Sequence, residues 1–161
     1  MLDLPAASGG EGYLSVHPDF TAIFTSNPGE YAGVHRSQDA LRDRMATLDL
    51  GHFDEDTETR IVSAKAGIAG SDAAAIVRLV RGLRESGACE VLPTVRTSIL
   101  LARTLHAANA TTDRDGTFRR LCLNIMASQS SRDGNAAHIV RARETLEGLL
   151  DREALLEARA S

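Results

Sequence analysis

The sequence contains no tryptophan, and aromatic residues make up only 4% of its 161 positions. A core must therefore be built from Leu, Ile, Val and Ala, which suits helix packing better than a β-sandwich. The hydrophobic fraction of 43% is that of an ordinary globular protein. At this length, we expect one ordinary domain or two small ones.

Cysteine is scarce, and long apolar runs are absent. Cys89 and Cys122 lie far apart and fit no metal-ligand spacing, so we interpret them as buried or half-buried thiols in a reducing compartment. No apolar run approaches about 18 residues, which excludes a transmembrane helix. The N-terminus lacks the basic and apolar regions of a signal peptide. These absences predict a soluble cytoplasmic protein.

The net charge of −4 does not favour nucleic-acid binding, because such surfaces are usually basic. Several catalytic motifs are also missing. No G-x-x-x-x-G-K-[ST] phosphate-binding loop occurs, no G-x-S-x-G nucleophile motif occurs, and no apolar strand ends in Asp-Glu. The five histidines show no metal spacing, so we predict no metal site.

The first 51 residues are typical of an α/β protein. Phe20–Thr25 is a short apolar, β-branched run that ends at a turn, and Met45–Leu50 is a second candidate strand. Ser37–Arg44 between them is typical of a short helix, which makes the pair resemble part of a parallel sheet. Two strands are too few for such a sheet, so we expect the remaining strands to be missing or to come from another chain.

Residues 52–161 are typical of an all-α bundle. Asp54 is a candidate N-cap for a helix that ends at Gly67, and Ser71 is a candidate cap for a helix up to about Ser86. Further helices are expected from Pro93-Thr94, around Phe118–Ile125 and from about Ala136. One apolar stripe has the spacing of a buried helix face; it consists of Ile76, Leu79, Val80 and Leu83.

Asn27 directly follows the predicted strand Phe20–Thr25. Ligands of open α/β sheets bind at the carboxyl ends of parallel strands, so Asn27 is a candidate site residue. The alternative is that Asn27 only begins a turn before Pro28.

Arginines flank the short predicted helix and begin a later one. Guanidinium groups neutralise transferring phosphoryl oxygens, and a neighbouring subunit can supply one in trans. Arg36, Arg42 and Arg44 are therefore candidates, although a solvated helix face is the alternative. Arg96 stands at the start of the helix after Pro93, where it opposes the helix dipole. That position favours a bound anion or a carboxylate partner, and a simply exposed arginine is the alternative.

Most of these candidate residues lie in one stretch that resembles a known family. Residues 16–50, VHPDFTAIFTSNPGEYAGVHRSQDALRDRMATLDL, strongly resemble the gas vesicle protein N family, which belongs to the MoxR-like AAA+ ATPases close to the CbbQ and NorQ chaperones. HFDEDTETRIVSAKAGI (52–68), SDAAAIVRLVRGLRE (71–85) and PTVRTSILLARTL (93–105) keep the same order and spacing. The resemblance covers about residues 1–130.

The resemblance implies a fold and a set of roles. Residues 1–51 would be the C-terminal part of the AAA+ α/β core, with the last two strands of its parallel sheet, and residues 52–161 would be the helical lid. Asn27 matches sensor 1, Arg44 matches the arginine finger that acts in trans, and Arg96 matches sensor 2. Arg36 and Arg42 are the alternatives for the finger.

The resemblance also implies ATP and Mg²⁺ as cofactors, other AAA+ ring subunits and gas vesicle structural proteins as partners, and a cytoplasmic location at gas vesicles. It is partial, because the phosphate-binding loop and the acidic strand of the family are missing. We therefore expect this chain alone not to hydrolyse ATP. The alternative is a non-catalytic helical module that docks on gas vesicle proteins or on intact ATPase subunits. A DNA-binding domain is disfavoured by the acidic charge.

Overall fold

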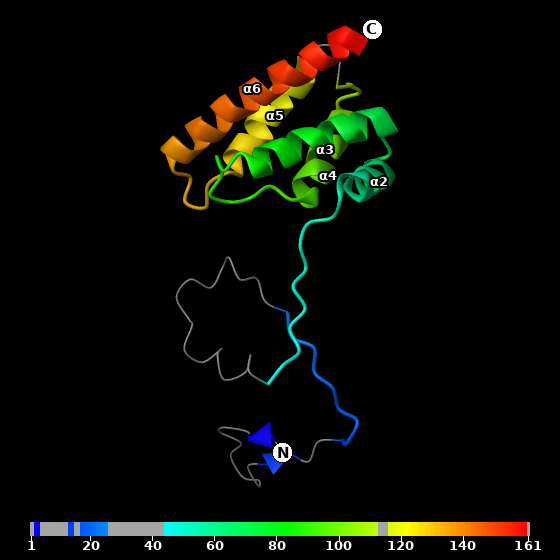
Figure 1. The fold of residues 1–161 in the computed structure, drawn as a ribbon, viewed down its shortest axis with the longest axis vertical. Helices are drawn as coiled ribbons and strands as arrows, with labels where there is room; N and C mark the ends of the chain where they lie inside the picture. The colour runs from blue at the N-terminus through cyan, green and yellow to red at the C-terminus, as the bar shows by residue number, and fades with distance from the viewer. Residues whose placement is uncertain (1, 4–12, 15–16, 26–43, 113–115, 161) are drawn as a thin grey trace. The chain divides into compact units, whose positions relative to one another are not determined.

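Helices occupy most of the chain after residue 54. The computed structural model describes residues 2–3, 13–14, 17–25, 44–112 and 116–160. The chain divides after Asp49 into two units, Met1–Asp49 and Leu50–Ser161 (Figure 1). The described residues of the second unit form five helices, in order α2 (Glu55–Ala66), α3 (Gly70–Glu85), α4 (Val95–Ala107), α5 (Thr117–Ser128) and α6 (Ala136–Ala160).

Local residues fix the ends of α2. The Asp54 carboxylate accepts hydrogen bonds from the Thr57 N–H and the Thr57 hydroxyl, both at 2.8 Å, and so caps the first turn. Acidic residues in that turn also suit the positive end of the helix dipole. At the other end, Gly67 adopts φ 70°, which costs a residue without a Cβ little, and its N–H bonds to the Ser63 carbonyl. Both ends of α2 are as predicted.

The remaining helices agree with prediction except at one start. Thr94 caps α4 through a hydrogen bond from the Arg96 N–H to its hydroxyl, and α6 begins at Ala136, as expected. The predicted cap of α3 is wrong, because α3 begins at Gly70 and Ser71 lies inside its first turn. In this first turn, the Asp72 carboxylate accepts hydrogen bonds from the Thr112 N–H and hydroxyl, which join the start of α3 to the segment after α4.

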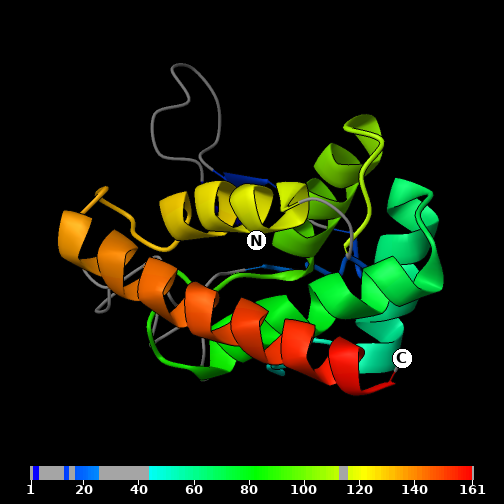
Figure 2. The same cartoon turned by 90° about the horizontal axis from the view of Figure 1, so that it is seen from above.

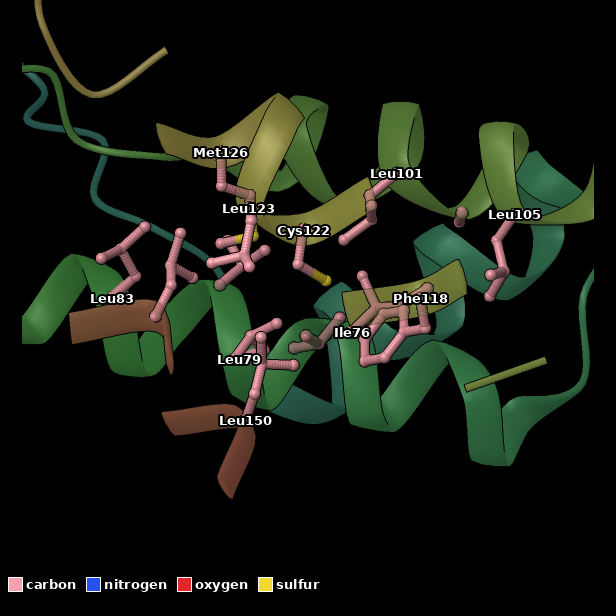
Figure 3. Packing of buried hydrophobic residues seen from close by; sticks show 14 of the residues in the cluster. Ile76, Leu79, Leu83, Leu101, Leu105, Phe118, Cys122, Leu123, Met126 and Leu150 are labelled. Atoms are coloured by element: carbon pink, nitrogen blue, oxygen red, sulfur yellow. The ribbon is translucent and has the colours of Figure 1, made fainter. Parts of the chain in front are cut away.

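The core lies between α3, α4, α5 and α6, with α2 packed against α3 and α4. The predicted stripe of Ile76, Leu79, Val80 and Leu83 is buried throughout. Figure 3 shows side chains of α3 and α6 facing those of α4 and α5, among them Leu101, Cys122 and Met126. Aliphatic side chains therefore supply most of this core, as the lack of aromatic residues predicted.

The longest helix, α6, lies alongside α5 and also contacts α3 (Figure 2). Gly82 of α3 allows α6 to lie close, because a Cβ added at Gly82 would lie 3.1 Å from Leu149 Cδ2 of α6. Arg119 of α5 donates a hydrogen bond to Asp151 of α6 at 2.6 Å, which joins the two helices at the surface. The predicted all-α bundle is thus confirmed for residues 55–112 and 116–160.

The two predicted strands are not formed. Phe20–Thr25 and Met45–Leu50 are both irregular, so the predicted parallel pair is not seen among the described residues. Among the described residues of the first unit, the paired strands are β1 (Leu2–Asp3) and β2 (Tyr13–Leu14), which are antiparallel. A strand needs a neighbour to bond its N–H and C=O groups, and the described part of the chain offers these segments none.

Candidate functional site

The first turn of α4 carries Arg96, the predicted sensor 2. Thr94 ends the extended segment before the helix, and its carbonyl accepts hydrogen bonds from the Thr97 N–H at 2.9 Å and the Ser98 N–H at 3.3 Å. Arg96 is exposed, and its guanidinium makes no hydrogen bond or ion pair with any residue that the structure describes. The group is therefore open to an anion from solution or from another chain.

The side chains next to Arg96 point inward. Ser98 is fully buried, and its hydroxyl has no hydrogen-bond partner within the described parts of the chain. Thr97 is 7% exposed and donates to Gln129 at 3.3 Å, which ties α4 to the end of α5. The first turn of α4 thus has one outward charged side chain between residues held by the bundle.

A buried ion pair lies behind this turn. Glu58 of α2 is only 1% exposed, and Arg84 of α3 donates to its two carboxylate oxygens at 3.1 and 3.5 Å. Arg84 Nε also donates to the Pro93 carbonyl at 2.8 Å, directly before the Thr94 cap. The pair therefore joins α2 and α3 to the start of α4.

A second arginine of α3 contacts the same carboxylate. Arg81 Nη1 lies 3.7 Å from Glu58 Oε2 and donates to the Phe53 carbonyl at 3.0 Å. Phe53 directly precedes Asp54, the cap of α2. Glu55 and Glu85 lie near the outer side of the Arg81 guanidinium, each 3.9 Å from one of its nitrogens. The two arginines together hold the residues that precede α2 and α4.

This network was not predicted from the sequence, although two signals of it were present. Glu58, Val62 and Ala66 are spaced four residues apart and form the buried face of α2, so an acidic residue stands in a core position. Arg81 and Arg84 stand three residues apart on α3, as do residues that share a helix face. The carbonyl contacts were not predictable, because they depend on how the segments before α2 and α4 fold back onto α3.

The other four predicted site residues belong to the first unit, and the described residues do not test whether they group with Arg96. Arg44 is exposed in a turn. Asn27, Arg36 and Arg42 lie outside the described residues. Their grouping around a nucleotide therefore stays a prediction.

A polar cluster joins the loop before α4 to the start of α6. The Glu90 carboxylate accepts from the Arg132 N–H at 3.1 Å and the Ser131 hydroxyl at 3.3 Å, and His138 Nδ1 lies 3.3 Å from it. The Arg132 N–H, followed by His138, lowers the pKa of the Glu90 carboxyl by stabilising its charged form. The Glu90 and Val91 N–H groups also donate to the Ser130 carbonyl, so the cluster joins the loop before α4 to the loop before α6.

The cysteines are free thiols, half-buried at Cys89 and buried at Cys122, as predicted. Burial raises the pKa of both thiols, which disfavours the reactive thiolate. Among the described residues, no group of three or more His, Cys, Asp or Glu side chains is placed to hold a metal ion. Within the same ranges, no helix has the length and apolar character needed to cross a membrane.

Comparison with known proteins identifies relatives over most of the chain. This chain is 47% identical over 131 residues to the gas vesicle ATPase GvpN of Ancylobacter aquaticus, and the match covers 80% of this chain and 36% of that protein. It is 42% identical over 132 residues to GvpN2 of Halobacterium salinarum, over 81% of this chain and 37% of the relative. GvpN1 of the same organism is 34% identical over 152 residues, over 94% of this chain and 42% of the relative.

The chain therefore spans about two fifths of the length of these relatives. No family model matches it, and no solved structure matches it significantly. The resemblance to the gas vesicle family seen in the sequence is confirmed by these matches. Over about four fifths of its length, this chain is homologous to a part of the gas vesicle ATPase GvpN.

Proposed function

We propose that this chain is part of a gas vesicle ATPase and that its residues act in ATP hydrolysis coupled to gas vesicle assembly. The observation that carries the proposal is the identity of 41–47% to three proteins of that name over about 130 residues. In this proposal, residues 1–51 form the C-terminal part of a MoxR-like AAA+ core, and residues 52–161 form its helical lid. The five-helix bundle is compatible with the lid assignment.

Arg96 acts in this proposal as sensor 2, which contacts the nucleotide of its own subunit. Its exposure and its open guanidinium support this role, because guanidinium donors match phosphate oxygens in pairs. Arg44 acts as the arginine finger on the nucleotide of a neighbouring ring subunit, with Arg36 and Arg42 as alternatives. Asn27 orients the attacking water as sensor 1.

The described residues fit only part of an ATP site. Exposed arginines can neutralise phosphate charge, but no described carboxylate cluster is placed to hold Mg²⁺. In the proposal, the phosphate-binding loop, whose motif the sequence lacks, and the metal ligands come from another segment, in the same protein or in a partner. Positioning and charge stabilisation dominate phosphoryl transfer, so the 161-residue polypeptide alone is expected to be inactive.

Exposed apolar side chains in the first unit support the proposal that further strands of a sheet cover them in the complete protein. Ile23 is 90% exposed and Leu48 is 87% exposed, although both stand in apolar, strand-like segments. Apolar side chains of a parallel strand are normally covered on both faces. In the proposal, Phe20–Thr25 and Met45–Leu50 become strands when they pair with the rest of the AAA+ sheet.

The test is reconstitution. This chain is mixed with the separately produced nucleotide-binding part of a gas vesicle ATPase, and ATP turnover is measured for each part and for the mixture. We expect turnover only in the mixture, and we expect Arg44→Ala to lower it by about 10³-fold, as removal of an arginine finger does. Arg96→Ala is expected to lower it by about 10²-fold. Full turnover with both variants would refute the assigned roles.

The matched control is Arg60→Ala. Arg60 is an exposed arginine that pairs with Asp56 on the surface of α2, so its loss should leave turnover unchanged. A loss equal to that of Arg96→Ala would show a general effect of surface charge.

The second candidate function is a non-catalytic docking module. It is favoured by exposed apolar side chains on the bundle, where Leu92 is 48%, Leu100 44% and Val140 53% exposed. Such a module would bind gas vesicle proteins or intact ATPase subunits in pull-downs. Binding that persists with Arg96→Ala and without nucleotide, together with no turnover in the mixture, would favour this function.

A further inference from the structure

Two arginines of α3 connect one buried carboxylate to the residues that precede two helix caps. Arg81 holds the Phe53 carbonyl before the cap of α2, and Arg84 holds the Pro93 carbonyl before the cap of α4. Both guanidiniums face Glu58. The segment that enters α2 and the segment that enters α4 are thus fixed to the same point.

The two hydrogen bonds of Arg84 restrict the orientation of its guanidinium. The Arg84 side chain is 8% exposed, and its planar guanidinium uses Nε for Pro93 and Nη2 for Glu58. Both bonds can form only in a narrow range of orientations, because the donors of a guanidinium are held in a fixed fork. A lysine at this position would keep the charge but have only one nitrogen to share between the two acceptors.

Any displacement of Pro93 reaches Arg96 through a short, bonded path. Thr94 follows Pro93 directly, and its hydroxyl and carbonyl accept hydrogen bonds from the Arg96 and Thr97 N–H groups. The orientation of the first turn of α4 therefore depends on where Arg84 holds the Pro93 carbonyl.

We propose that Glu58, Arg81 and Arg84 are positioning residues that fix the first turn of α4, and with it the Arg96 guanidinium, relative to the segment that enters α2. The link to catalysis rests on the proposed function of Arg96. The positioning itself is a property of this bundle and is testable without nucleotide. A misplacement of about 1 Å in such a group can lower a rate by about 10²-fold.

The first test separates positioning from stability. Replacing a buried ion pair by apolar residues of similar volume often preserves folding, whereas removing one partner does not. The double variant Glu58→Leu/Arg84→Met is therefore compared with the unmodified chain by amide hydrogen exchange. We expect the Thr97 and Ser98 amides to exchange on the order of 10-fold faster, with unchanged exchange in the centre of α3.

The matched control is Arg119→Met/Asp151→Leu, which removes the pair between α5 and α6. It should leave the Thr97 and Ser98 amides unchanged. If the Glu58/Arg84 double variant also keeps their exchange rates at the original value, the positioning proposal is wrong.

The second test uses the reconstituted ATPase with Arg84→Lys, which keeps the charge but loses the fork. We expect kcat to fall about 10- to 100-fold with little change in KM, because the Arg96 position is altered while the phosphate-binding parts are intact. If Arg96→Ala lowers turnover and folded Arg84→Lys does not, positioning is refuted and the function stands. If Arg96→Ala has no effect, the sensor role fails, and the exchange experiment still decides the positioning.

Discussion

Two regions of this chain carry similar apolar residues with opposite outcomes. In segments 17–25 and 45–50, Ile23 is 90% exposed and Leu48 is 87% exposed. In the bundle, Ile76 and Leu83 are fully buried. Hydrophobicity alone therefore does not decide burial in this protein.

The difference lies in how each element satisfies its backbone. A helix bonds its own N–H and C=O groups within one segment, so α2–α6 can form first and then bury their apolar stripes against one another. A strand must find a second strand before its backbone is satisfied. The helices of the bundle pack against one another, whereas the strand-like segments have no partner among the described residues.

The largest effect is expected where a buried charge loses its partner. Glu58→Ala leaves the Arg84 guanidinium buried without its carboxylate, and we expect a loss of about 3–5 kcal/mol in the free energy of unfolding. Asp151→Ala breaks the more exposed pair with Arg119 and should cost less than about 1 kcal/mol. Urea denaturation measures both values, and equal losses would show that burial does not set the strength of these pairs.

The two apolar populations can be compared directly. Leu83→Ala opens a cavity in the core between α3 and its neighbours, and it should cost about 3 kcal/mol of unfolding free energy. Leu48→Ala removes an exposed side chain and should change stability by less than about 0.5 kcal/mol. The contrast between the regions is broken if Leu48→Ala proves as costly as Leu83→Ala in the same denaturation experiment.

The contribution of a local C-cap to helix stability is tested at Gly67, which ends α2. Its φ of 70° is unfavourable for any residue with a Cβ, so Gly67→Ala should lower the unfolding free energy by about 1–2 kcal/mol. Gly70→Ala is the control, because Gly70 lies at the start of α3 with open space around it. Thermal denaturation of both variants checks this prediction, which would be contradicted by equal melting temperatures.

The smallest effect is a pH dependence at the cap of α2. The hydrogen bonds from Thr57, first its N–H and then its hydroxyl, lower the pKa of the Asp54 carboxyl by stabilising the carboxylate. A folded pKa below the unfolded value gives stability that is present above about pH 4 and is lost as pH falls through the folded pKa. Asp54→Asn caps without titrating, so its melting temperature should fall less between pH 5 and pH 3.

Two further variants check the origin of that dependence. Asp54→Ser should behave like Asp54→Asn, because a hydroxyl also caps without a charge. Asp54→Ala should lower the melting temperature at neutral pH as well, since no acceptor remains. An acid sensitivity in Asp54→Asn equal to that of the original chain would place the effect in other carboxylates, such as Glu90, whose pKa is also lowered.

The helices were predictable where short-range chemistry defines them. Asp54 with Gly67 delimits α2, and Thr94 opens α4, because caps involve residues within one or two turns. The predicted cap at Ser71 is wrong, because α3 begins at Gly70 after Ala69, whose side chain makes no capping hydrogen bond and so gives no signal in the sequence. The Arg96 position at the start of α4 could be predicted, but the hold of Arg84 on Pro93 behind it could not.

The sequence by itself determined the caps, the buried stripes of the helices and the likeness to gas vesicle ATPases, because each is written in residues close together along the chain. Only the tertiary structure decided that Glu58 is buried between two arginines and that the strand-like segments are unpaired among the described residues, with exposed apolar side chains. Ion pairs and strands join residues that are distant in sequence, so their formation depends on which partners the folded chain brings within reach.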